Sequence, residues 1–217
     1  MEREKAINHK NNSLHRLDIS FFKHIDLEEY KKSHLLAYWI NDFSNYHDEE
    51  STFDCSKIKI FKRGNIVKAN LGFNIGNELG GLHYCIVLNK NDNPKNGTLN
   101  VIPLTSKNKN YKGCINLGNE IYELLNKNLQ FKENTLYNLV KENNNSNITN
   151  QMQKEIECIH KLSVEIKKMK QNSVALINQI TTISKQRLFD IDILHNVKLS
   201  SSTLNKLDKA ILENFTK

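Results

Sequence analysis

A glycine-rich stretch at residues 62–88 brings together residue types that can perform acid–base chemistry. It holds five of the eight glycines of the chain and also contains Glu78 and His83. Glycine adopts backbone conformations that other residues avoid, and it lets a ligand approach the main chain closely. A carboxylate and an imidazole offer groups of opposite charge, and histidine changes its charge near neutral pH. This loop is therefore the first place to look for a functional site.

A second candidate is the run Thr105-Ser106-Lys107, which ends an apolar stretch at 98–104. Two hydroxyls and a cation at the end of a strand can bind an anion. The same residues also suit a turn or a helix cap. By the residues alone, His83 fits a hydrogen-bonded structural histidine beside an apolar strand better than a catalytic one. The residue types leave these alternatives open.

The elements that must position these residues have strand patterns. Residues 66–71 and 85–88 are apolar, with alternation or β-branched side chains, and they flank the glycine-rich loop. The turn formers at 89–97 predict a surface turn. Residues 173–180 predict one long strand, followed by a short helix at 181–188 with Ser184 as its cap.

The segment 119–172 has helical spacing. Apolar residues recur every three or four positions on both sides of an Asn-rich break at 143–147. We expect an antiparallel helical hairpin inserted into the domain, with a structural role. Its lysines at 167, 168 and 170 are interpreted as a solvated face. A role in binding a ligand or a partner protein is the alternative.

The two ends of the chain are also predicted to be helical. Residues 1–13 suggest a frayed start, and Asp26 with Glu29 predicts a capped helix with an apolar stripe. This arm is expected to dock on its own domain rather than on a partner, with a linker at 45–56. Ser201 or Ser202 is expected to cap a final helix. We divide the chain into an extension at 1–57 and a domain at 58–217, interrupted by the hairpin.

Three ordered blocks of sequence carry a family resemblance. Residues 76–88, GNELGGLHYCIVL, resemble the first long loop and second strand of the MazF/PemK toxins, with the motif Gly-Ser-Glu-x-Gly-Gly-x-Arg-Pro. Residues 101–107, VIPLTSK, are similar to the family's strand that ends in a catalytic threonine. Residues 175–188, ALINQITTISKQRL, resemble its segment Gln-Ile-x-Thr-Ile. The resemblance covers roughly residues 58–117 and 173–217.

The resemblance implies a fold and an activity. The fold is mainly β with α additions: an SH3-like (MazF/PemK/CcdB-type) β-barrel with an N-terminal helical arm, a helical-hairpin insertion and a C-terminal helix. The activity is that of a type II toxin, a metal-independent endoribonuclease that cleaves single-stranded RNA through a 2′,3′-cyclic phosphate. No cofactor is implied, and the partners are RNA, an antitoxin and a second copy in a homodimer. The implied catalytic residues are His83 and Thr105, and the implied substrate-binding residues are Glu78, Gly80, Gly81, Ser106, Lys107 and Gln179.

The sequence departs from the family pattern at His83, where the family has Arg, and at Tyr84, where it has Pro. Arginine holds its charge, whereas histidine can act as a general base or acid. Two rival functions stay open. One is a toxin of the same barrel fold that binds DNA gyrase without catalysis, and the other is an inactive RNA-binding barrel, which the missing Arg favours.

Composition agrees with an anionic partner, since the formal charge is +7. A Lys- and Asn-rich chain from an AT-rich genome would give the same charge. The sequence shows no apolar run of membrane-spanning length and no hydrophobic signal region, so we expect a cytoplasmic protein. The four cysteines have no zinc-site or disulfide spacing. A metal site at Asp190, Asp192 and His195 is disfavoured because no further carboxylates accompany it.

Overall fold

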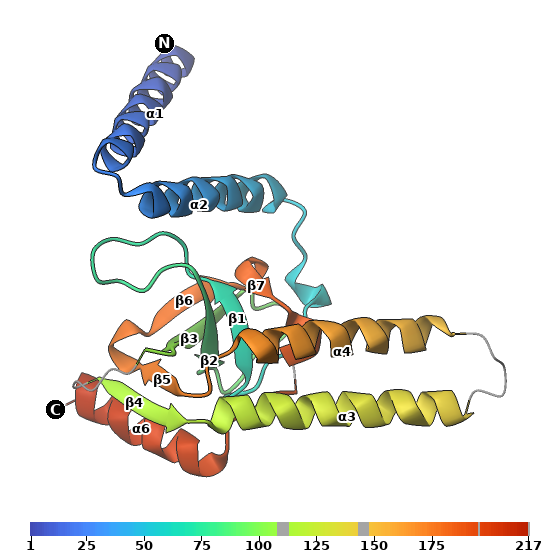
Figure 1. Ribbon diagram of the computed structural model, residues 1–217. Helices are drawn as coiled ribbons and strands as arrows, with labels where there is room; N and C mark the ends of the chain where they lie inside the picture. Colours follow the sequence, from blue (N-terminus) through green and yellow to red (C-terminus); the bar gives the residue numbers. More distant parts are fainter. Residues whose placement is uncertain (108–112, 143–147, 195, 217) are drawn as a thin grey trace. The chain divides into compact units, whose positions relative to one another are not determined.

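The computed structural model describes residues 1–107, 113–142, 148–194 and 196–216. These residues form two units, Met1–Ser51 and Thr52–Lys217. The first unit consists of two helices, and the second carries every strand that is described (Figure 1).

The first unit contains α1 (Glu2–Asp26) and α2 (Tyr30–Glu49). The frayed start predicted for residues 1–13 is wrong, because α1 covers these residues. Neither glycine nor proline interrupts them, and two glutamates lie in the first turn, where negative charge stabilises a helix. No described residue of α1 or α2 is buried.

The helix start predicted at Asp26 is also wrong. Asp26 ends α1, and α2 begins at Tyr30 without a side-chain cap. The chain turns between the helices because Glu28 has a φ of 59°, in the left-handed region that helices do not use. The docking of this arm on its own domain, rather than on a partner, stays a prediction.

The second unit is built on a seven-stranded antiparallel sheet. Its strands are β1 (Ile66–Asn70), β2 (Leu82–Val87), β3 (Thr98–Thr105), β4 (Cys114–Gly118), β5 (Ser173–Leu176), β6 (Thr181–Ser184) and β7 (Leu188–Phe189). The pairing order is β4-β5-β3-β2-β1-β7, with β6 also paired to β3. Among the described residues this path ends at β4 and β7, so the sheet is not closed. With its helices the fold is mixed α/β.

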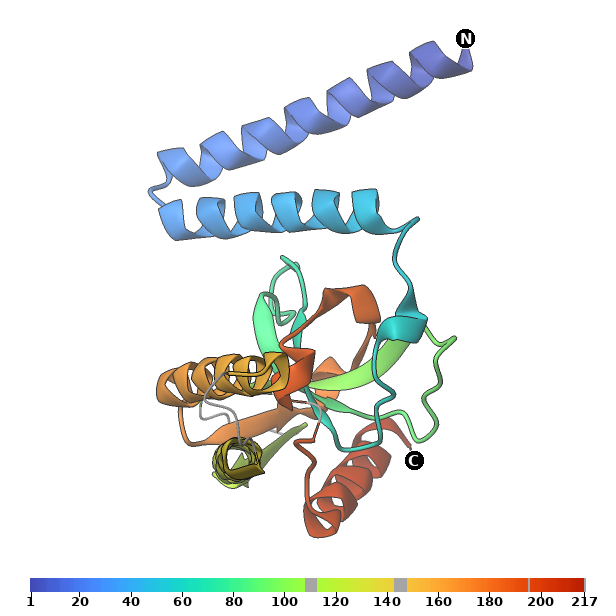
Figure 2. The same ribbon diagram turned by 90° about the vertical axis from the view of Figure 1, so that its right-hand side faces the viewer.

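The helices of the second unit are α3 (Glu120–Glu142), α4 (Asn150–Lys168), α5 (Ile191–Leu194) and α6 (Ser201–Phe215). α3 and α4 run side by side as a hairpin in both views (Figures 1 and 2). The predicted break at 143–147 lies outside the described residues. α6 is capped by Ser200, one residue before the predicted cap, and its hydroxyl accepts a hydrogen bond from the Thr203 amide at 3.3 Å.

The segment after the hairpin differs from its prediction. The expected long strand stops at Leu176, and the 3₁₀ turn η2 (Ile177–Gln179) redirects the chain. Residues 181–184 then form β6 instead of a helix, as threonine and isoleucine favour strands. Ser184 does act as a cap, but for the 3₁₀ turn η3 (Lys185–Arg187).

β3 organises the core because it pairs along both of its edges. One edge pairs with β2, and the other pairs with β6 near its start and with β5 at Leu104 and Thr105. Successive side chains of a strand point to opposite faces, so two apolar clusters form. The larger joins strand residues such as Ile102 to α3, α4 and α6, and the smaller surrounds Val101 and Phe61.

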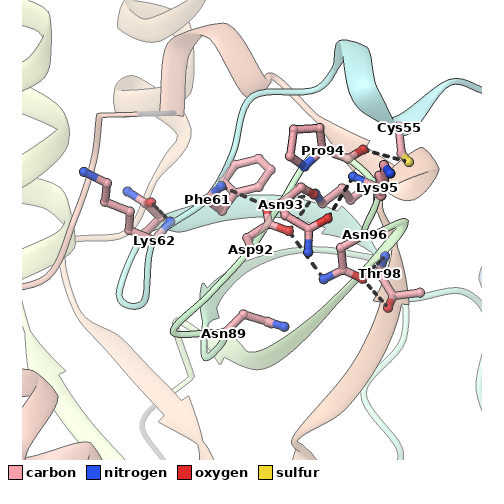
Figure 3. Close-up of polar contacts among 12 residues, drawn as sticks. Cys55, Phe61, Lys62, Asn89, Asp92, Asn93, Pro94, Lys95, Asn96 and Thr98 are labelled. Atoms are coloured by element: carbon pink, nitrogen blue, oxygen red, sulfur yellow. Dashed lines mark hydrogen bonds and ion pairs between the residues drawn. The ribbon is translucent and has the colours of Figure 1, made fainter.

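The turn between β2 and β3 is fixed by Asp92, whose side chain is completely buried. Its carboxylate accepts a hydrogen bond from the Phe61 amide at 2.9 Å and another from the Asn96 side chain at 3.4 Å (Figure 3). Lys185, also completely buried, lies 2.8 Å and 2.9 Å from the two carboxylate oxygens. The predicted surface turn is therefore anchored to the core.

Candidate active site

The loop between β1 and β2 is closed at its neck by backbone hydrogen bonds. The Gly81 amide donates to the Gly72 carbonyl at 2.6 Å, and the Leu71 amide donates to Gly81 at 2.9 Å. Gly81 has a φ of +89°, which side chains disfavour. A Cβ on Gly80 would lie only 2.5 Å from the Gly72 oxygen. Glycines 80 and 81 thus shape the approach to His83.

Gln179 holds the outer part of this loop. Its side-chain oxygen accepts a hydrogen bond from the Leu79 amide at 3.1 Å, and its side-chain nitrogen donates to the Asn77 carbonyl at 3.2 Å. Glu78 is exposed and contacts the Ile75 amide of its own loop at 3.4 Å. Glu78 and Gln179 line a pocket of about 400 Å³ that does not contain His83. They are therefore placed beside the loop rather than at the imidazole.

His83 and Thr105 come together at the ends of two paired strands. The pairing of β2 with β3 ends at Cys85 and Pro103, and His83 and Thr105 each stand two residues beyond this pair. The Nδ1 atom of His83 lies 2.9 Å from the Leu104 carbonyl oxygen. Since a carbonyl can only accept, Nδ1 carries the proton. In the neutral ring, Nε2 is then the nitrogen that can accept a proton.

Thr105 is buried, with 8% of its surface exposed. Its hydroxyl oxygen accepts a hydrogen bond from the Lys107 amide at 3.2 Å, and its hydroxyl hydrogen remains able to donate. This contact is the local turn that the residue types allowed. It also fixes the direction of the hydroxyl beside His83.

A pocket of about 340 Å³ joins these groups. It is lined by His83, Thr105, Ser106 and Lys107. Two lysines at the C-terminal end of α4, Lys168 and Lys170, line it as well. A proton acceptor, a hydroxyl donor and several cations in one cavity suit a phosphate group. The two hairpin lysines were not among the predicted site residues, and their only signal in the sequence was a cluster of positive charge.

A partly buried polar cluster surrounds Tyr84, the residue after His83 on β2. The Lys68 ammonium is 2.7 Å from Glu165 and 3.2 Å from Asp190, and the Tyr84 hydroxyl donates to Glu165 at 2.9 Å. Burial and the adjacent Glu165 carboxylate raise the pKa of Tyr84 far above its usual range. Burial acts to raise the pKa of Glu165, but hydrogen bonds from Lys68 and Tyr84 outweigh it and lower the pKa. The cluster joins α4 to β1 and β2.

Other titratable groups have no place at this site. Burial raises the pKa of Cys85 to about 12, so its thiol stays protonated. Asp190 is paired with Lys68, and Asp192 lies 3.2 Å from the Lys59 ammonium. Within the described ranges, no group of three or more metal-ligating side chains is found. His195, the third residue of the disfavoured metal site, lies outside them.

The central part of the domain matches a known protein family. Residues 62–130 match the family model described as PemK-like, MazF-like toxin of type II toxin–antitoxin system. The resemblance to this toxin family is therefore confirmed. The matched residues include the glycine-rich loop, His83, Thr105 and the first half of α3. The third block of resemblance, at 175–188, lies outside it and stays a prediction.

The structure of MazF (Form-I) from Deinococcus radiodurans is similar at 13% identity, with a TM-score of 0.37. The similarity covers 72% of this chain and 96% of that chain. No curated protein matches. In the part of the chain that the structure describes, no helix combines the length and apolar character needed to span a membrane.

Proposed function

We propose that this protein is the toxin of a type II toxin–antitoxin system and cleaves single-stranded RNA without a metal ion. The observation that carries the proposal is the pocket lined by His83, Thr105 and three lysines, with His83 and Thr105 within the segment that matches the MazF/PemK toxins. We take the seven-stranded antiparallel sheet to be the counterpart of the SH3-like barrel of this family. A homodimer, a cognate antitoxin and a cytoplasmic location are part of the same proposal.

The reaction is an attack of the RNA's own 2′-hydroxyl on the adjacent phosphate. Neutral His83 accepts the 2′-proton at Nε2, the bond from the 2′-oxygen to phosphorus forms, and the bond from phosphorus to the 5′-oxygen breaks. The products are a 2′,3′-cyclic phosphate and a 5′-hydroxyl, whose proton comes from an acid or from solvent. The same histidine can return its proton to the leaving oxygen.

The remaining residues bind and orient the substrate in this proposal. Thr105 donates its hydroxyl to a phosphate oxygen, and Ser106 and Lys107 follow it at the exposed rim of the pocket. Gly80 and Gly81 leave room for the RNA backbone beside the loop. Glu78 and Gln179 contact nucleotides further along, from the adjoining pocket of about 400 Å³.

The test uses purified protein with single-stranded RNA in EDTA, together with a DNA gyrase supercoiling assay. We expect cleavage that leaves a 2′,3′-cyclic phosphate and a 5′-hydroxyl, with no effect on gyrase. Inhibition of gyrase without cleavage supports the non-catalytic toxin instead. Binding of RNA without cleavage supports an inactive RNA-binding protein.

A further inference from the structure

We propose that Lys168 and Lys170, at the end of the α3–α4 hairpin, bind backbone phosphates of the RNA beside the one that is cleaved. This inference rests on the proposed function, and it gives the hairpin insertion a role in substrate binding. Both lysines line the same pocket of about 340 Å³ as His83 and Thr105, although they lie more than sixty residues away from them in the sequence.

The chain leaves α4 at the wall of this pocket. Lys168 is the last helical residue, and Met169 leaves the helix in an extended conformation, with φ −75° and ψ 135°. Met169 packs against the larger apolar cluster and also lines the pocket. Lys168, Met169 and Lys170 therefore form one wall of the pocket at the point where the chain leaves α4.

The end of α4 is held in place one helical turn before Lys168. Glu165 binds the Lys68 ammonium at 2.7 Å and the Tyr84 hydroxyl at 2.9 Å, and Tyr84 directly follows His83 on β2. The side chains of Lys68 and Glu165 are only 14% and 21% exposed. A partly buried, charge-assisted contact of this kind holds its geometry better than an exposed ion pair. The end of α4 that carries Lys168 is thereby held against β1 and β2.

The positive charge of the pocket favours an anion as its ligand. Lys107, Lys168 and Lys170 all line it, and among the described residues none of the three takes part in a salt bridge within the chain. Glu165 offsets part of this charge, since Lys168 helps to lower the pKa of that carboxylate. The remaining positive charge attracts a polyanion. A single-stranded RNA supplies phosphates along one path, and only one of them needs to reach His83.

The test measures binding separately from cleavage. The probe is a single-stranded 2′-O-methyl RNA, which lacks the attacking hydroxyl, and its Kd is measured against salt concentration. The variant is Lys168→Gln with Lys170→Gln. The matched control is Lys161→Gln with Lys167→Gln, which removes two charges from the same helix at exposed side chains that do not line the pocket. Thermal unfolding checks that both variants fold.

We expect the pocket variant to bind on the order of tenfold more weakly than the wild type. The slope of log K against log salt should fall by about 1.4, since each phosphate contact to a single strand contributes about 0.7. The control variant should keep the wild-type slope. Equal losses in both variants, or no loss in either, overturn this inference and leave the nuclease proposal standing. A wild type that binds the probe but does not cleave ordinary RNA overturns the nuclease proposal alone, and one that binds no RNA overturns both.

Discussion

The Nδ1 atom of His83 donates a hydrogen bond to the Leu104 carbonyl, 2.9 Å away, in the residue directly before Thr105. This bond selects the tautomer in which Nε2 carries no proton. It also joins the first residues of β2 to the last residues of β3. An arginine side chain has donors only and cannot accept a proton in this way. The replacement of the family's Arg by His83 therefore changes the chemistry that this position can perform.

The first prediction concerns His83→Arg and pH. If neutral His83 accepts the 2′-proton, the wild-type rate should rise with pH as the imidazole loses its charge. His83→Arg removes that titrating group, so this rising limb should flatten. The measurement is single-turnover cleavage of one short RNA by both proteins at fixed ionic strength. The same bend in both profiles would assign the ionisation to another group.

The second prediction concerns the neck of the loop. Gly80→Ala places a Cβ against the Gly72 carbonyl, at 2.5 Å in the present geometry, so the loop must shift. Displacement of a binding loop by about 1 Å can slow catalysis on the order of a hundredfold. Gly97→Ala is the matched control, because its Cβ meets nothing within 4 Å. Cleavage rates that fall equally in the two variants are incompatible with this role of Gly80.

The third prediction concerns the buried pair of Asp92 and Lys185. Asp92→Ala leaves the Lys185 ammonium buried without its carboxylate, which should lower the free energy of unfolding by about 3–5 kcal/mol. Glu213→Ala, which removes the exposed partner of Lys209, should cost about 1 kcal/mol or less. Urea denaturation measures both. A loss for Asp92→Ala as small as the control's would mean that water reaches Lys185.

The fourth prediction concerns acid stability through Glu165. Its pKa in the folded state is below the ordinary value of a glutamate, because the hydrogen bonds from Lys68 and Tyr84 outweigh the effect of burial. The folded state therefore binds this proton less readily than the unfolded state does. The stability that Glu165 contributes is fully present above about pH 4.5 and is lost as pH falls through the lower, folded-state pKa.

Glu165→Gln should be less stable than the wild type at neutral pH and should lose less stability between about pH 5 and 3. The exposed Glu133→Gln on α3 serves as the control and should follow the wild-type curve. Thermal unfolding across this pH range provides the data. Parallel curves for the wild type and Glu165→Gln contradict the linkage.

Much of this arrangement could be predicted from local sequence. The alternation at 66–71 and the apolar run at 85–88 predicted β1 and β2, and the heptad-like spacing predicted α3 and α4. The position of Thr105 at the end of an apolar stretch was equally readable. In each case the signal is contained within one element, where periodicity reports which face is buried.

Contacts between distant elements could not be predicted in this way. The residue types show Lys168 and Lys170 only as charges on a helix, and their approach to His83 depends on where Glu165 fixes α4. Asp92 appeared as one of several turn formers, because its buried partner Lys185 lies 93 residues further along. The amide of Gln179 meets a loop 100 residues before it. Such pairs are set by packing of the whole domain rather than by local propensity.

The most direct test of the account follows one short RNA under single-turnover conditions in EDTA, with wild type and His83→Ala. The account predicts that the wild type produces a 2′,3′-cyclic phosphate and a 5′-hydroxyl, and that it leaves the RNA intact when the attacking 2′-hydroxyl is replaced by hydrogen. His83→Ala should remain folded, bind the same RNA and cleave it at least about a hundredfold more slowly. Wild-type cleavage by His83→Ala, or cleavage of the 2′-deoxy substrate, would contradict the proposed site and its chemistry.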